Sequence, residues 1–184
     1  MNHQIFDFVG GETGLWRVLK IETVVGQPIQ QVPFLNIVQS TGIPHSSNGW
    51  VLKGFRSNTR YTERLELDQL IAIQAELGRT EAICAALIPI RKTEAWWALA
   101  QDERRKIFED QSKHTATGLK YLPAIARRLY HCRDIGEPFD FLTWFEYAPE
   151  HAEAFEELVH HLRGTAEWQY VDWEIDIRLI QTDK

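Results

Sequence analysis

The sequence has few of the motifs from which common active sites are built. Its two cysteines, Cys84 and Cys132, lie far apart and form neither a CxxC nor a CxxCH motif. Covalent haem attachment is therefore excluded, and buried thiols in a reducing compartment are favoured. The GxGxxG, P-loop, HExxH and GxSxG patterns are absent too. Nucleotide-binding, zinc-protease and serine-hydrolase functions thereby lose their usual support.

Long apolar runs are also missing. The longest nearly apolar stretch, 82–90, is too short to cross a bilayer. The N-terminus lacks the basic stretch followed by an apolar one that marks a signal peptide. We therefore expect a soluble, cytoplasmic protein, unless a leader for the periplasm has been removed.

Charge is unevenly distributed along the chain. The net charge of −6 argues against general nucleic-acid binding. Within the acidic second half, however, residues 104–133 carry eight basic and two acidic side chains. Such a segment is either an anion site or a solvated helix face. A solvated face suits Arg127 and Arg128 poorly, because apolar residues surround them.

The chain is long enough for one compact domain and is rich in aromatic residues. Of its 184 residues, seven are Trp, nine Phe and five Tyr. A domain of this length buries roughly 70% of its unfolded surface and needs no disulfide or metal to fold. The aromatic residues either build a bulky core or line a pocket for a large flat ligand.

Periodicity predicts alternating strands and helices. Strands are expected at 16–25, 50–56, 83–90, 139–147 and 168–180, and helices at 62–77, from 93 onward and from 149 onward. The order strand, helix, strand occurs at 50–90 and again at 139–180. We therefore predict one α+β domain, 1–184, made of two ferredoxin-like halves, about 1–92 and 93–184, with an antiparallel sheet and helices on one face.

One histidine is a candidate metal ligand. His131 is expected in the core, and Glu157 with His160 has di-iron spacing but lacks the second pair that such sites need. If the helix from residue 93 continues to His114, this side chain lies on the face of Ile107 and Gln111. It is then either a haem ligand beside aromatic and cationic residues, or a helix C-terminal cation favoured by the dipole.

Four stretches of the sequence resemble a known family. They are IPIRKTEAWW (88–97), SKHTATGLKYLPAIARRLYHCRD (112–134), FDFLTWFEY (139–147) and LRGTAEWQYVDWEIDIRL (162–179). In this order and at this chain length they resemble the chlorite dismutases, specifically the short-chain, dimeric branch. The resemblance implies a homodimeric α/β barrel with one noncovalent haem b per chain, held in the second half.

The resemblance also implies roles for single residues. His114 would be the proximal iron ligand, Glu167 the carboxylate hydrogen-bonded to it, and Arg127 the distal catalytic arginine. The other implied cofactor contacts are Lys92, Trp96, Trp97 and Tyr61 near the haem edge and propionates, and Gln74, Thr143 and Phe145 on the distal side.

The implied activity is that of a chlorite O2-lyase, which converts chlorite to chloride and dioxygen. An oxygen atom passes to ferric haem to give an oxo-iron species, and Arg127 retains the transient hypochlorite until the two recombine. One alternative with the same fold is a peroxidase-like enzyme or a coprohaem decarboxylase, which resembles longer chains and uses Tyr with a nearby Lys instead of the distal Arg. Another is a haem-binding or sensing protein without turnover.

Overall fold

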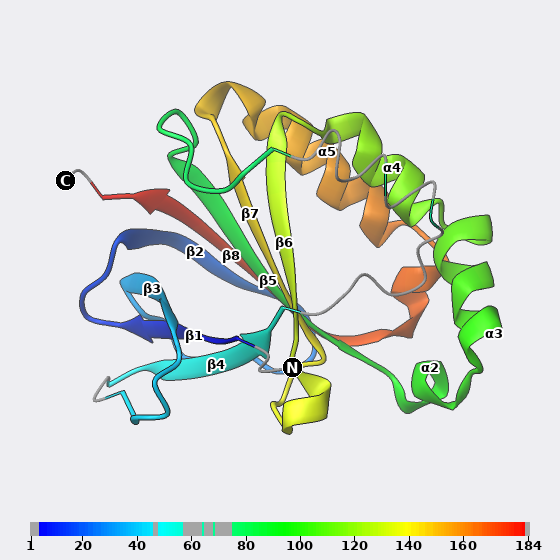
Figure 1. Cartoon of the computed structure of the whole chain (residues 1–184), viewed down its shortest axis with the longest axis horizontal. Helices are drawn as coiled ribbons and strands as arrows, with labels where there is room; N and C mark the ends of the chain where they lie inside the picture. Colours follow the sequence, from blue (N-terminus) through cyan, green and yellow to red (C-terminus); the bar gives the residue numbers. More distant parts are fainter. Residues whose placement is uncertain (1–3, 46–47, 57–63, 65–67, 69–74, 183–184) are drawn as a thin grey trace.

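The computed structural model describes residues 4–45, 48–56, 64, 68 and 75–182. In these residues, eight antiparallel strands close into a barrel (Figure 1). The strands are β1 (Ile5–Gly11), β2 (Trp16–Val25), β3 (Phe34–Gln39), β4 (Trp50–Phe55), β5 (Cys84–Lys92), β6 (Ile125–His131), β7 (Phe141–Tyr147) and β8 (Val171–Gln181).

Helices and short helical turns connect the strands of the second half. They are α2 (Glu94–Ala98), α3 (Gln101–Arg105), η1 (Lys106–Gln111), α4 (His114–Tyr121), η2 (Arg133–Ile135), η3 (Pro149–His151), α5 (Ala152–Arg163) and η4 (Glu167–Tyr170). Helices α2 to α5 all lie on the side of the barrel formed by β5 to β8 (Figure 1). None of the helices in the described part of the chain is long and apolar enough to span a membrane.

The strand order repeats between the two halves. Around the barrel it reads β4-β1-β3-β2 and then β8-β5-β7-β6. If the four strands of each half are numbered 1 to 4 along the chain, both halves have the order 4-1-3-2. This is the ferredoxin-like order, and it confirms the predicted fold class. The division near residue 92 stays a prediction, although β5, which it assigns to the first half, is hydrogen-bonded to β7 and β8.

The two halves meet along two unlike seams. Strands β2 and β8 pair from Trp16 and Gln181 to Val25 and Glu174, with two irregularities in register. Between β4 and β6, the described residues pair only at Phe55 and His131. Gly54 permits the close approach there, since a Cβ at this position would lie 2.7 Å from the Cβ of Tyr130.

Alternation along β7 divides the core into two layers, as the sequence predicts. Leu142 and Trp144 lie in the barrel interior, where Trp144 packs edge-on against Trp16. Phe145 and Tyr147 face outward and contact Phe155 of α5.

Some expectations from periodicity are corrected by the structure. The strand expected from residue 139 begins at Phe141, and Phe139 precedes it and packs in the barrel interior. The strand expected from residue 168 begins at Val171, because 167–170 forms a 3-10 turn. Most of the helix expected at 62–77 lies outside the described residues. Arg64 and Asp68 are described and helical, and their side chains form an ion pair at 3.1 Å. Residues 75–77 are described and are not helical.

Both cysteines are free thiols. Cys132 is buried and Cys84 is half-buried. Burial raises the pKa of each thiol above its ordinary value. The prediction of buried thiols is thus confirmed for Cys132, whereas Cys84 is only half-buried.

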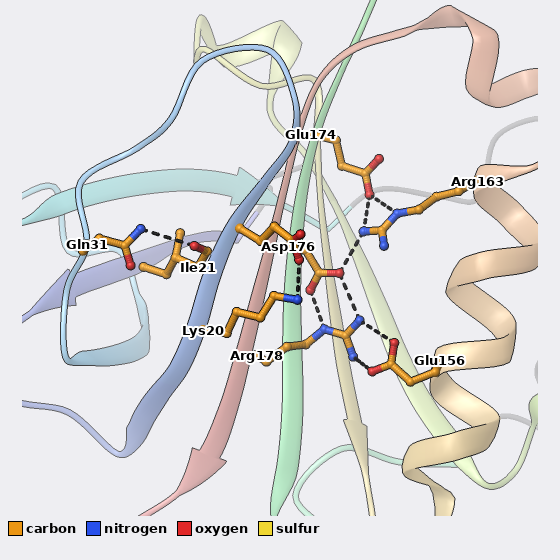
Figure 2. Close-up of polar contacts among 9 residues, drawn as sticks. Lys20, Ile21, Gln31, Glu156, Arg163, Glu174, Asp176 and Arg178 are labelled. Carbon is orange, nitrogen blue, oxygen red and sulfur yellow. Dashed lines mark hydrogen bonds and ion pairs between the residues drawn. The ribbon is translucent and has the colours of Figure 1, made fainter.

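A charged network fastens α5 to the outward face of β8 (Figure 2). Arg163 of α5 donates to Glu174 and Asp176, each at 2.8 Å. Arg178 of β8 also contacts Asp176, and it reaches back to Glu156 of α5. Burial alone would raise the pKa of Asp176, but the hydrogen bonds and charges of Arg178 and Arg163 hold it below 3.8.

Asp176→Asn should destabilise the fold by about 2 kcal/mol at neutral pH, because it weakens buried charge-assisted hydrogen bonds. Folding lowers the pKa of Asp176, so its contribution is complete above the unfolded value and is lost as the pH falls below 3.8. Chemical denaturation at pH 7 and pH 3 should show the difference between wild type and variant shrinking at pH 3. Glu156→Gln, at an exposed end of the network, should cost less than about 1 kcal/mol. An equal loss from both variants would contradict the role of Asp176.

Candidate cofactor-binding and active site

A cavity lies between the outward face of β5 to β8 and helices α4 and α5. About 1270 Å³ of space not filled by protein atoms lies within and in front of it, open solvent at its mouth included. Apolar side chains from the sheet and from α5 form most of its wall: Ile88, Ile90, Ile125, Phe141, Phe145, Leu158, Val159 and Leu162. Eight charged or polar residues also line the cavity, and an apolar wall that carries such groups is the usual construction of a cofactor or substrate site.

His114 lies on this wall as the first residue of α4, not at the end of a continuing helix. The chain turns through the π-helix η1, and Lys113 then takes the left-handed conformation with φ 53°. Buried Glu109 accepts hydrogen bonds from the backbone N–H groups of Thr115 and Ala116, at 2.8 and 3.3 Å. His114 is therefore held at a capped helix start, and the alternative of a helix C-terminal cation is wrong.

The His114 ring is fixed by a carboxylate and by an aromatic ring. Its Nδ1 lies 2.7 Å from Oε2 of Glu167, and the Phe108 ring stacks on it with a centroid distance of 4.3 Å. A carboxylate at Nδ1 selects the tautomer that carries the proton there. The other nitrogen, Nε2, is thereby left as the atom able to bind a metal.

Glu167 also holds a buried ammonium. Lys92, 4% exposed, donates from Nζ to Oε1 of Glu167 at 2.8 Å. Burial would raise the pKa of Glu167, but the charges and hydrogen bonds of His114 and Lys92 bring it down to about 2. The resemblance implies a place for Lys92 near the cofactor edge. In the structure Lys92 lines the cavity and is hydrogen-bonded to Glu167. The three side chains form one unit, His114–Glu167–Lys92.

The sheet side of the cavity carries a half-buried cation, Arg127. Arg127, Leu129 and His131 occupy alternate positions of β6 and all line the cavity. Arg127 pairs in register with Phe145 of β7. Burial lowers the pKa of Arg127 from its ordinary value, yet a guanidinium starts so high that it stays charged at neutral pH. His114 thus comes from the helical wall and Arg127 from the wall formed by the sheet.

Most of the predicted site residues described by the structure line this one cavity. They are His114, Glu167, Arg127, Lys92, Trp96, Thr143 and Phe145. Trp97 is not on the wall: its indole N–H donates to Asp140 at 3.1 Å, and its ring lies beside Phe141 and under Arg133. Tyr61 and Gln74 lie outside the described residues.

Sequence reasoning missed several lining residues. His131, expected in the core, is buried and lines the cavity. Phe108, Trp168 and Glu174 line it too. Alternation along β8 could have indicated Glu174, which faces opposite to the core residues Ile175 and Ile177. Nothing in the local pattern distinguishes Phe108, because the π-helix shifts it out of helical period.

The chain is similar to proteins of one family. Residues 36–180 match the family model described as chlorite dismutase. Of curated proteins, the chlorite dismutase of Ideonella dechloratans is 37% identical over 62 residues, which is 34% of this chain and 20% of that protein. The aligned stretch thus spans about a fifth of that relative.

Solved structures extend the similarity over nearly the whole chain. The dimeric chlorite dismutase of Nitrobacter winogradskyi has a TM-score of 0.90 and 57% identity, covering 96% of this chain and 99% of that one. The chlorite dismutase of Candidatus Nitrospira defluvii, solved in complex with imidazole, has a TM-score of 0.61 and 27% identity, covering 74% of this chain and 56% of that one.

Proposed function

Since the chain belongs to the chlorite dismutase family, we propose that it is a haem enzyme that decomposes chlorite to chloride and dioxygen. The observation that carries the proposal is that His114 and Arg127 line the same largely apolar cavity from different walls. One supplies a metal ligand and the other a fixed positive charge for a small anion.

The residues of the cavity fit a noncovalent haem b, one per chain. An imidazole whose Nδ1 is bound to a carboxylate is the donor that a haem iron takes, and a single protein ligand suffices because the macrocycle provides the others. His114 would bind the iron, and the apolar side chains of β5, β7 and α5 would contact the ring. When bound, the haem supplies the redox chemistry of oxygen-atom transfer.

Glu167 and Lys92 set the electron donation of His114. The contacts of Glu167 with His114 and Lys92 hold its pKa below the ordinary value of a carboxyl group, and this favours the carboxylate. It can therefore accept the proton on Nδ1 strongly, and this makes the imidazole a better donor. Lys92, hydrogen-bonded to the other oxygen of Glu167, draws part of that negative charge away from the imidazole.

Arg127 binds and retains the anion. Its guanidinium is a planar group with N–H donors, and its half-buried position on the wall of a largely apolar cavity strengthens its attraction for a chlorine oxyanion. Dioxygen forms only if the chlorine species left after the first O–Cl cleavage stays in the cavity. Arg127 would hold it there while the second oxygen transfer takes place.

Arg127 also favours chlorite decomposition over the activity of a coprohaem decarboxylase of the same fold. Such a decarboxylase needs a Tyr and a nearby Lys on the distal side, in place of the Arg. Among the described residues lining the cavity, the one lysine is Lys92, and Glu167 holds it.

The assembly that we propose is a homodimer. The Nitrobacter winogradskyi relative is dimeric and is matched over 99% of its length. Light scattering coupled to size exclusion should therefore give a mass of twice 21.4 kDa.

Oxygen release tests the proposed activity directly. Haem-loaded protein given chlorite in an oxygen electrode should release one dioxygen and one chloride per chlorite consumed. An absorption spectrum taken first establishes that haem is bound. A protein with a Soret band that releases no dioxygen would refute the activity, and a protein that takes up no haem would refute the cofactor as well.

A further inference from the structure

Trp168 connects the unit His114–Glu167–Lys92 to the charged network between α5 and β8. It directly follows Glu167 in the short turn η4 and lines the cavity. Its indole N–H donates to Oε2 of Glu174 at 2.7 Å. Its ring lies 5.3 Å from Nζ of Lys92. One side chain therefore touches a buried anion at its edge and a buried cation at its face.

The Lys92 ammonium depends on aromatic rings because little water reaches it. Its short hydrogen bond goes to Oε1 of Glu167 at 2.8 Å, and the Glu167 carbonyl is farther away at 3.4 Å. The rings of Trp96 and Trp168 lie 4.8 and 5.3 Å from Nζ. Cation–π attraction of this kind is stronger for a desolvated cation than for an exposed one.

Glu174 in turn fixes the Trp168 ring. It is fully buried on β8, and Arg163 of α5 donates to it at 2.8 Å. Arg163 is tied to Asp176, which Arg178 also holds, so the acceptor of the indole N–H is itself immobilised (Figure 2). A carboxylate accepting from an indole N–H also increases the electron density of the ring, and this strengthens its attraction for a cation.

We propose that Trp168, held by Glu174, is a positioning residue that keeps the Lys92 ammonium on Glu167 and so limits how strongly Glu167 accepts the proton of His114. The proposal rests on the proposed function, because His114 matters here as a haem ligand. If the Lys92 ammonium is not held on Glu167, the carboxylate is a stronger acceptor for the Nδ1 proton of His114. The imidazole then gains anionic character, which stabilises ferric over ferrous haem.

Trp168→Phe tests the inference because it keeps a ring and removes the N–H. Two properties of the haem-loaded variant are measured: the reduction potential, and the Fe–His stretching frequency in the ferrous resonance Raman spectrum. Lys92→Met serves as the reference for complete loss of the ammonium. Trp168→Phe should shift both properties in the same direction as Lys92→Met and by less. We expect the potential to fall, with the ferric-to-ferrous ratio at a fixed applied potential rising roughly threefold.

Trp173→Phe is the matched control. Trp173 also donates its indole N–H, to the carbonyl of Gln27 at 2.7 Å, and Arg91 lies over its ring at 5.1 Å. It does not line the cavity, so its replacement should leave the potential and the Fe–His frequency unchanged. A purely packing role for Trp168 would lower the melting temperature and leave both haem properties at wild-type values.

The inference is overturned if Trp168→Phe binds haem with wild-type potential and Fe–His frequency while Lys92→Met shifts both. Should Trp168→Phe not fold, Glu174→Gln decides the matter. Its amide oxygen can still accept the indole N–H but carries no charge, so a shift in the Lys92→Met direction is expected and no shift refutes the inference. Wild-type protein that binds no haem would instead refute the proposed function.

Discussion

His114→Ala should abolish stable haem binding, with at least a hundredfold loss of affinity, which corresponds to about 2.7 kcal/mol or more. His114 is the imidazole that lines the cavity with its Nδ1 taken by Glu167. Alanine removes the metal ligand and leaves Glu167 without that partner. The apolar wall would still attract a macrocycle, but without an iron bond. Titration with haem, followed at the Soret band, measures the loss.

Two further proteins separate loss of the ligand from damage to the fold. His160→Ala removes an exposed histidine of α5 and should bind haem as wild type does. In His114→Ala, added imidazole can occupy the space of the missing ring, so millimolar imidazole should restore a low-spin or wild-type-like spectrum. Full haem occupancy of His114→Ala with an unchanged spectrum and no imidazole would show that another residue is the ligand.

Arg127→Ala should load haem normally but inactivate itself during turnover. The variant keeps the unit His114–Glu167–Lys92, which lies on the helical side, and loses the cation on β6. Without that charge, hypochlorite leaves the cavity before the second oxygen transfer and oxidises the haem and the protein. We expect roughly a tenfold drop in the chlorite consumed before bleaching, together with a lower yield of dioxygen per chlorite.

A chlorination-sensitive trapping dye measures the escape of hypochlorite. Arg127→Lys is the matched control, because it keeps the charge and loses the planar fork of donors. It should lie between wild type and Arg127→Ala in both dye reaction and bleaching. Equal dye reaction in all three proteins would contradict a retaining role for Arg127.

Alternation was the most reliable guide from sequence to structure. It located β7 and put Thr143 and Phe145 on one face of that strand, and both side chains line the cavity. In a strand with the barrel interior on one side and helices on the other, successive side chains point to opposite sides. The side chains can therefore be sorted into two faces without knowing which residues they contact. The sequence left open whether the aromatic residues form a core or line a pocket, and they do both. Trp16 and Trp144 fill the barrel, whereas Trp96 and Trp168 line the cavity.

The environment of His114 could not be obtained in this way. Helical periodicity assumes an unbroken helix, and the π-turn with the left-handed Lys113 breaks the phase just before His114. The hydrogen-bond partner of His114, Glu167, lies 53 residues away in sequence, and Lys92, which binds the other oxygen of Glu167, lies 75 residues from Glu167. Residue patterns carry no signal for such pairs, so family resemblance alone linked His114 to Glu167, and only the structure joined Lys92 to them.

Among the described residues, the two seams between the halves differ in length, and this predicts where the native protein should open first. Amide hydrogen exchange reports local opening, and its free energy is lowest where few backbone hydrogen bonds must break. The long pairing of β2 with β8 should exchange slowly, and the residues around Phe55 and His131 quickly. Because His131 also lines the cavity, such a fluctuation would loosen the cavity wall at the edge of the sheet while the opposite seam keeps the two halves together. A bound ligand that contacts this wall should slow exchange at Phe55 and His131 more than along β2.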